Sequence, residues 1–192
     1  MDEEKPIRAF LAIDLPEDIL QEMAGVQARL KRSLHGDISW VRPEGVHLTL
    51  KFFGNIFAAD VKTISDIVEK QSAAVAPMQF QLEELGAFPN QQRPRVIWIG
   101  LQGDVDPLLE LQRNLDHQFQ SIGFPMEDRP FRAHLTLGRV KTSKGPIGLP
   151  QAVSEIKVTG EFRADSLVLF RSELTPKGAH YTKLATFMFR GA

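Results

Sequence analysis

One tetrapeptide occurs twice in this chain, and its repetition restricts the fold. The sequence His-Leu-Thr-Leu occupies residues 47–50 and again residues 134–137, at an offset of 87 residues. The same offset carries the apolar stretch 8–13 onto 95–100, so 39 residues separate the start of each stretch from the histidine of its copy. Short apolar stretches of this kind are typical of β-strands. A repeat at this long period predicts two related halves.

Each copy also holds one helical pattern between its strand and its histidine. Residues 16–34 begin with Pro-Glu-Asp and place apolar residues on one stripe. Residues 106–122 show the same periodicity and predict a second helix. Asp106 is its expected N-cap and Pro107 its expected first helical residue.

The two copies resemble each other after the histidines as well. Stretches 80–88 and 162–170 match at an offset of 82 and predict one strand each. Helical patterns precede them, at about 59–75 and, more briefly, at 149–156. A last strand at 181–189 is expected to close a sheet begun elsewhere in the chain.

These elements predict an α+β fold with two pseudo-symmetric lobes around a central cleft. Each lobe would be a small, mostly antiparallel sheet with outer helices. No Gly/Ser linker separates repeats 8–88 and 95–170, so residues 1–192 are expected to form a single bilobal domain. Residues 141–150, rich in Gly, Pro and Lys, are the expected mobile loop.

The tetrapeptide itself suggests chemistry. Alternate side chains of a strand point to opposite faces, so His47 and Thr49 would share one face while the leucines anchor in the core. His134 and Thr136 repeat that arrangement. Two histidines can supply one general base and one general acid near neutral pH. Threonine hydroxyls can donate hydrogen bonds to a phosphoryl oxygen as its charge grows.

A purely structural role is the alternative for this motif. A single His-Leu-Thr-Leu fits a half-buried strand in any protein, and a duplicated fold could retain both copies for packing. Leucine, however, packs a strand better than histidine does. Two identical copies at equal distances from matching strands favour a functional site.

Composition excludes several other functions. The formal net charge is −1, from 23 basic and 24 acidic side chains, which argues against coating nucleic acid by bulk charge. There are no cysteines, and no histidine or carboxylate cluster suggests a metal site or a bound cofactor. The acidic start of the chain and the lack of a long apolar run predict a cytoplasmic protein without membrane contact.

With these residues in view, the sequence resembles the two-histidine (2H) phosphoesterases. Within that superfamily it is most similar to the bacterial and archaeal RNA 2′,3′-cyclic phosphodiesterases, also called 2′-5′ RNA ligases. The resemblance covers nearly the whole chain, and neither tetrapeptide departs from the family pattern. The similar segments are 8–16, 40–54, 95–101, 131–139 and 169–174, with Gly178 and Tyr181.

The resemblance implies metal-independent hydrolysis of a 2′,3′-cyclic phosphate at an RNA end or on a nucleoside, leaving a 2′-phosphate. It implies that His47 protonates the departing 3′-oxygen, that His134 activates water, and that Thr49 and Thr136 hold the phosphate. Run backwards, the same site would join RNA ends through a 2′-5′ linkage. No obligatory protein partner is implied. The alternative function is a non-catalytic module that binds RNA ends or nucleotides in the same cleft.

The fifth residue after each histidine forms a second pair, Phe52 and Arg139. The resemblance implies that an aromatic ring and a guanidinium plane at these positions bind the terminal base between them. Strict alternation would place both on the leucine face, so this arrangement needs a bulge, for which Gly138 offers a place. The same alternation would place Lys51 on the face of His47. Phe52 could otherwise be a core residue, and Lys51 a solvated edge lysine.

Overall fold

A computed structural model describes residues 5–142, 145–176 and 178–191. Two residues of the expected loop 141–150 and most of the acidic N-terminus lie outside the described residues. In chain order, the elements are β1 (Ile7–Ile13), α1 (Glu17–Ser33), β2 (Ile38–Trp40), the 3-10 helix η1 (Pro43–Gly45), β3 (Leu48–Ile56), α2 (Ala58–Ala73), β4 (Met78–Phe88), β5 (Val96–Gly103), α3 (Val105–Ser121), β6 (His134–Val140), α4 (Leu149–Glu155), β7 (Glu161–Ala164), β8 (Ser166–Thr175) and β9 (Gly178–Met188).

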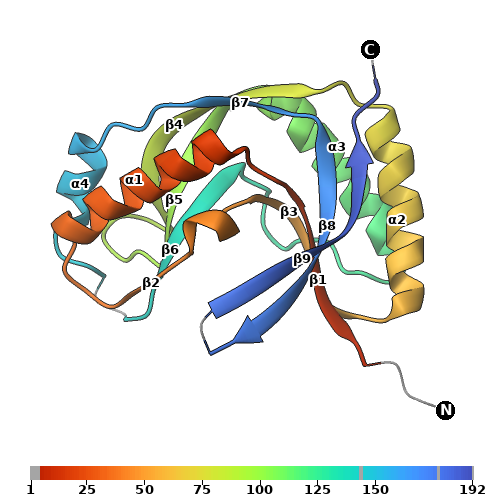
Figure 1. Cartoon of the computed structure of the whole chain (residues 1–192), viewed down its shortest axis with the longest axis horizontal. Coiled ribbons are helices and arrows are strands. Elements are labelled where there is room, and N and C mark those ends of the chain that lie inside the picture. The colour runs from red at the N-terminus through yellow and green to blue at the C-terminus, as the bar shows by residue number, and fades with distance from the viewer. Residues whose placement is uncertain (1–4, 143–144, 177, 192) are drawn as a thin grey trace.

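The strands form two sheets, and their paired neighbours run antiparallel (Figure 1). The first sheet has the order β3-β1-β8-β9, and the second has the order β2-β6-β5-β4-β7. In Figure 1, α1 and α4 lie together on one side of the molecule, and α2 and α3 lie together on the other. The α+β class predicted from the sequence is confirmed. No helix among the described residues is long and apolar enough to cross a membrane.

The two sheets exchange strands between the sequence repeats. β4 ends the first repeat but pairs with β5 of the second, and β8 belongs to the second repeat but pairs with β1 of the first. Each histidine strand therefore lies beside the opening strand of its own copy, and the third strand comes from the other copy. The prediction of one strand at 162–170 was wrong. The chain breaks at Asp165, because β7 joins the second sheet and β8 the first.

The start of α3 also differs from the prediction. Asp104, not Asp106, is the N-cap residue, and Val105 is the first helical residue. The Asp104 carboxylate accepts a hydrogen bond from the backbone N–H of Gln79, at 2.8 Å, and makes no side-chain cap to the helix. It thereby ties the beginning of α3 to β4.

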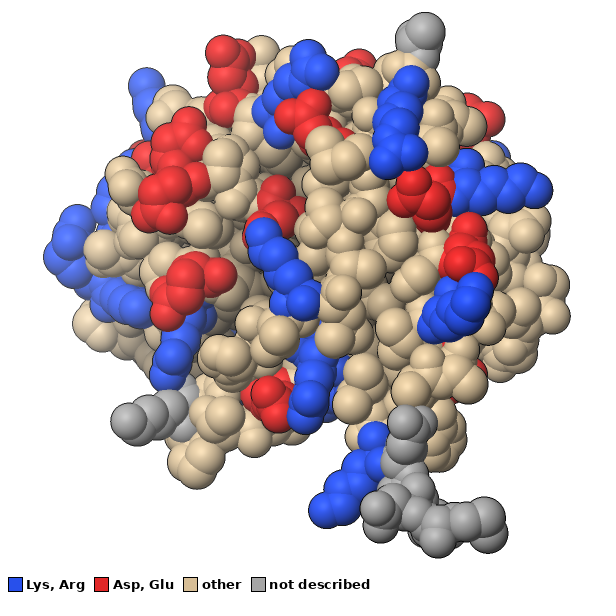
Figure 2. All heavy atoms as spheres, turned by 45° about the vertical axis from the view of Figure 1, so that its right-hand side comes forward, with Lys and Arg blue, Asp and Glu red and all other residues tan. Residues whose placement is uncertain are grey.

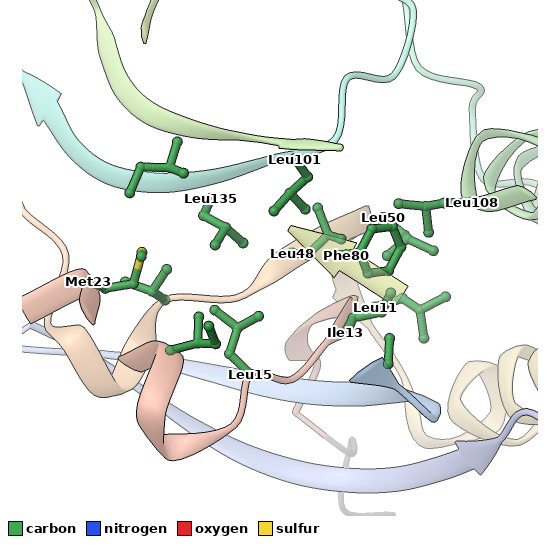
Figure 3. Packing of buried hydrophobic residues seen from close by; sticks show 14 of the residues in the cluster. Leu11, Ile13, Leu15, Met23, Leu48, Leu50, Phe80, Leu101, Leu108 and Leu135 are labelled. Carbon is green, nitrogen blue, oxygen red and sulfur yellow. The ribbon is translucent and has the colours of Figure 1, made fainter. Parts of the chain in front are cut away.

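One continuous hydrophobic core joins the two sheets (Figure 3). Leu48 and Leu135, the first leucines of the two tetrapeptides, are both fully buried in it. Leu11 from β1 and Leu101 from β5 belong to the same cluster. Both tetrapeptides are therefore anchored to one core, as the leucine face of each was expected to be.

The two histidine strands each carry a β-bulge at the same point of the repeat. The register of β3 against β1 skips Leu50, and the register of β6 against β5 skips Leu137. A bulge places two residues opposite one and changes the face on which the following side chains lie. Phe52 and Arg139 therefore turn away from the core and are exposed, whereas the bulged leucines stay buried.

A helix of the other copy contacts each bulged region. From α1 of the first copy, buried Gln27 donates through Nε2 to the carbonyl oxygen of Leu137 at 2.9 Å and to that of Val41 at 2.7 Å. From α3 of the second copy, buried Asp116 pairs with Lys51, the residue that follows Leu50. The bulges are thus supported by polar side chains from distant parts of the chain.

Candidate active site

Both His-x-Thr pairs line one cavity of about 820 Å³. His47 immediately precedes β3 and His134 is the first residue of β6, so the cavity draws one histidine from each sheet. Other residues that line it include Val41, Gly45, Phe52, Phe88, Arg95, Glu127, Arg129, Phe131, Arg132, Arg139 and Tyr181. The sequence repeat therefore brings its two copies together at a shared site.

Aromatic rings surround His47. Its ring stacks on Phe10 with centroids 4.5 Å apart and meets Tyr181 edge-on at 5.3 Å. Phe10 and Phe170 are themselves stacked at 5.1 Å and belong to a small cluster separate from the main core. This cluster forms an apolar floor beneath the first histidine.

His134 has a different setting, although its place in the repeat is the same. Phe88 meets its ring edge-on at 5.0 Å, and Trp98 lies at 6.5 Å. Both residues come from the second sheet, on β4 and β5. The two histidines therefore share a backbone motif but not their aromatic surroundings.

The same hydrogen bond orients both histidine rings. Nδ1 of His47 lies 2.8 Å from the carbonyl oxygen of Gly45, and Nδ1 of His134 lies 2.6 Å from that of Arg132. In each case the carbonyl belongs to the residue two positions earlier. A carbonyl oxygen can only accept, so Nδ1 carries the proton and Nε2 of the neutral ring is the free acceptor. Each histidine thus has one nitrogen available for proton transfer.

Burial lowers the pKa of His47 from 6.5 to about 4 and lowers the pKa of His134 in the same direction. The nearby positive charge of Arg139 lowers both pKa values further, whereas the Nδ1 hydrogen bonds oppose the shift. Asp14 raises the pKa of His47 and does not act on His134. Both rings are therefore neutral at pH 7 in the free protein.

The two threonines are positioned to bind a ligand. Thr49 and Thr136 are partly exposed, and both line the cavity. Neither hydroxyl has a hydrogen-bond partner among the described residues, so each can donate to an anion in the cavity.

Phe52 and Arg139, the second pair predicted from the sequence, also reach the cavity. Phe52 is 50% exposed, so the interpretation of Phe52 as a core residue was wrong. The bulge that this pair required is present, and it occurs in both histidine strands. In β6 its extra residue is Leu137, and not the neighbouring Gly138. Arg139 acts on the pKa values of both histidines and of Tyr181, which shows that its charge lies near all three.

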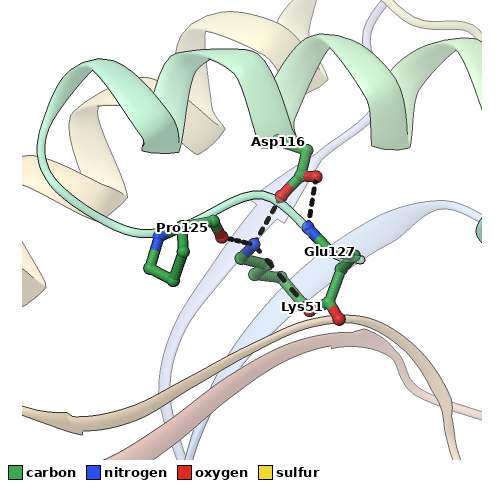
Figure 4. A network of polar contacts seen from close by, with 4 residues as sticks. All are labelled: Lys51, Asp116, Pro125 and Glu127. Atoms are coloured by element: carbon green, nitrogen blue, oxygen red, sulfur yellow. Dashed lines mark hydrogen bonds and ion pairs between the residues drawn. The ribbon is translucent and has the colours of Figure 1, made fainter. Parts of the chain in front are cut away.

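Lys51 is not on the face expected from strict alternation. The bulge at Leu50 turns its side chain inward, and it is 4% exposed. Its ammonium group donates to the Asp116 carboxylate and to the carbonyl oxygen of Pro125, and it lies 3.8 Å from Glu127 Oε1 (Figure 4). Lys51 is therefore a buried structural cation that contributes to the cavity lining while its charge is paired with Asp116.

The cavity is locally basic although the whole chain is not. Its basic lining residues are Lys51, Arg95, Arg129, Arg132 and Arg139, and Glu127 is its acidic residue. On the face shown in Figure 2, by contrast, acidic and basic side chains are interspersed. The lining around the two histidines thus carries more positive than negative side chains.

Arg93 and the other three histidines lie outside the cavity lining. Arg93 does not line the cavity, and His180 is exposed at the turn end of β9 while its neighbour Tyr181 enters the cavity. His35 and His117 are exposed as well. Among the residues that the structure describes, no three His, Asp or Glu side chains gather as metal ligands would.

The aromatic floor was missed as part of the site. Phe10 and Phe170 sit in apolar strand segments that resemble the family but lie far from both tetrapeptides in sequence, and the pairing of β1 with β8 places them beneath His47.

The fold and the site define a two-lobed phosphoesterase architecture. A crystal structure of TT0787 of Thermus thermophilus matches 96% of this chain and 99% of its own, with a TM-score of 0.80 and 27% identity. Escherichia coli LigT in its apo form has the same fold, with a TM-score of 0.76 and 24% identity over 96% of this chain and 98% of that one.

The sequence comparisons identify the family. The model of the LigT-like phosphoesterases matches twice, at residues 13–98 and 99–181, once for each tetrapeptide. An RNA 2′,3′-cyclic phosphodiesterase of Methanothermobacter thermautotrophicus is 36% identical over 94% of this chain and 98% of its own length. A second one, from Methanocaldococcus jannaschii, is 35% identical over 91% and 96%. The chain belongs to the LigT-like phosphoesterase family.

Proposed function

We propose that this protein is an RNA 2′,3′-cyclic phosphodiesterase that uses His47 and His134 as its acid and base. The observation that carries the proposal is the meeting of both His-x-Thr pairs in one basic cavity. The family, and relatives named RNA 2′,3′-cyclic phosphodiesterase over nearly the full chain, support the same activity.

The reaction requires a proton to leave water and a proton to reach the departing oxygen. His134 Nε2 accepts the proton of water as its oxygen bonds to phosphorus. The bond from phosphorus to the 3′-oxygen breaks, and His47 Nε2 donates a proton to that oxygen, leaving a 2′-phosphate. Thr49 and Thr136 donate to the phosphoryl oxygens. An arrangement with one proton carrier on each side of the phosphate suits in-line displacement.

Asp14 distinguishes the two histidines. Its negative charge favours the protonated form of His47 and has no such effect on His134. This supports His47 as the proton donor. Burial acts in the opposite direction, since it lowers the pKa of His47 to about 4. The donor role therefore requires the anionic phosphodiester to raise that pKa on binding, because an opposite charge at a few ångströms stabilises imidazolium.

Phe52 and Arg139 are proposed to hold the terminal base. Both line the cavity beside the histidines, and the bulges direct both toward it. An exposed phenylalanine ring and a guanidinium plane are surfaces on which any base can stack. This contact would not select a particular base.

Product analysis tests the proposed function. An RNA that ends in a 2′,3′-cyclic phosphate is incubated with the protein in excess chelator, and the product is compared with authentic 2′- and 3′-phosphate ends. We expect a 2′-phosphate. A 3′-phosphate would contradict the assignment of the 3′-oxygen as leaving group, and no hydrolysis at all would favour a binding module.

A further inference from the structure

We propose that segment 125–132 binds the RNA chain that precedes the cyclic end, with Arg129 and Arg132 on its phosphodiesters. The inference rests on the proposed function and narrows its substrate to the ends of oligonucleotides. It concerns a wall of the cavity outside both His-x-Thr pairs.

The cavity is asymmetric in the segments that lead into its two histidines. Ahead of His134, the lining residues include Glu127, Arg129 and Arg132. Ahead of His47, the corresponding lead-in contributes only Val41 and Gly45 to the lining. The repeat therefore supplies two similar proton carriers, but only the lead-in to His134 contributes charged residues to the lining. A polyanion that leaves the phosphate site would be attracted toward that side.

The buried Lys51 network holds this wall in place (Figure 4). Lys51 binds the carbonyl oxygen of Pro125 and the Oδ1 atom of Asp116. The other Asp116 oxygen accepts a hydrogen bond from the backbone N–H of Glu127 at 3.1 Å. Both ends of Pro125–Glu127 are thus fixed to β3 and α3.

Apolar contacts fix the segment on both sides of the network. Phe124 meets Phe53 edge-on at 5.1 Å, and Phe53 in turn meets Phe119 of α3 at 4.8 Å. Phe131 packs against the main core. A segment held in this way loses little backbone conformational entropy on binding.

The two arginines are available to an anion. Arg129 and Arg132 are exposed, and neither has a carboxylate within 4.0 Å among the described residues. The guanidinium of Arg132 lies over the Phe88 ring at 5.8 Å, close to His134. The Glu127 carboxylate points toward Lys51, 3.8 Å away, so it offsets less of the positive charge of the two arginines. Arginines beside a phosphate site are suited to the next phosphodiesters of the same strand.

Arg129→Gln tests the subsite with two substrates. One is a nucleoside 2′,3′-cyclic monophosphate, and the other is a short oligoribonucleotide with the same cyclic end. We expect kcat/KM for the oligoribonucleotide to fall about tenfold, mainly through KM, because a charge-assisted hydrogen bond is lost. The value for the mononucleotide should fall far less. The salt dependence of oligonucleotide binding should also weaken, by about 0.7 in its log–log slope for each lost phosphate contact.

Arg113→Gln is the matched control, because Arg113 is exposed on α3 and does not line the cavity. This variant should leave kcat/KM for both substrates, and the salt dependence of oligonucleotide binding, unchanged. If Arg129→Gln lowered kcat/KM equally for both substrates, or left the salt dependence of oligonucleotide binding unchanged, the proposed subsite would be overturned. A wild-type protein inactive on both substrates would contradict the proposed function instead. The subsite is then still tested by the affinity for an oligoribonucleotide that ends in a 2′-phosphate.

A second variant tests the positioning role of Lys51. Lys51→Met combined with Asp116→Asn removes both charges while keeping an acceptor for the Glu127 N–H. We expect this protein to retain its circular dichroism and to lose preference for the oligoribonucleotide through a higher KM. An unchanged preference would show that the network does not position the subsite.

Discussion

Leu50 and Leu137 occupy the same position of the two tetrapeptides, and each is the extra residue of a β-bulge. The bulge is what places Phe52 and Arg139 in the cavity together with the histidines. The duplicated unit is therefore larger than the tetrapeptide. Beyond each histidine, the duplicated features that reach the cavity continue through the bulge to the fifth residue after it.

Arg139→Gln should raise the pKa of both histidines. Its positive charge lowers the pKa of His47 and of His134, so its removal shifts each pKa back toward 6.5. The shifts can be followed by NMR titration of the histidine ring protons. Arg113→Gln, which changes the same charge outside the cavity, should leave both titrations in place. Unchanged pKa values in Arg139→Gln would contradict the central position of this guanidinium.

The low pKa of His47 predicts a loss of stability in acid. In the folded protein His47 resists protonation down to about pH 4, whereas in the unfolded chain it binds a proton below 6.5. The unfolded state therefore takes up more protons in this window, and the free energy of unfolding falls as pH falls from 6.5 to 4. Since one pKa unit corresponds to about 1.4 kcal/mol, the loss from this group is on the order of 3 kcal/mol.

Urea denaturation at pH 7 and pH 4 measures this loss. His47→Gln does not titrate and should lose less stability over the same interval than the wild type. His117→Gln, at an exposed position, should behave as the wild type does. Equal acid sensitivity in His47→Gln would show that burial of this histidine does not govern the effect.

Gln27→Met should disturb the site from a distance. The change removes two hydrogen bonds of Nε2, to the carbonyl oxygens of Val41 and Leu137. An acceptor deprived of its donor costs about 1–3 kcal/mol, which urea denaturation can detect. Because Leu137 is the bulged residue, the change should shift Arg139 from its place in the cavity. The KM for a 2′,3′-cyclic-phosphate RNA should then rise. Gln21→Met, on an exposed face of the same helix, is the control and should change neither quantity.

Much of the architecture follows from the sequence because it lies in local patterns. The offset of 87 residues predicts both opening strands and both histidine strands, and apolar periodicity predicts α1 and α3 to within one residue at their ends. The exchange of β4 and β8 between sheets has no local signal, because strand pairing is decided by contacts across the chain.

The faces of the strands could not be predicted for a similar reason. Lys51 was placed beside His47 by alternation, which holds only for a regular strand. The bulge that reverses it is stabilised by partners remote in sequence, such as Asp116 at 65 residues from Lys51. Gly138, the counterpart of Lys51 in the second copy, instead allows Ile38 to approach within 2.9 Å of where a Cβ would lie.

The most direct test is the rate at which the two histidine variants hydrolyse a 2′,3′-cyclic-phosphate RNA in excess chelator. General acid or base catalysis contributes about 10²–10⁴-fold to such a rate. His47→Ala and His134→Ala should each lower the single-turnover rate by that factor, whereas His35→Ala, outside the cavity, should not. A wild-type rate in either of the first two variants would contradict catalysis by the paired histidines.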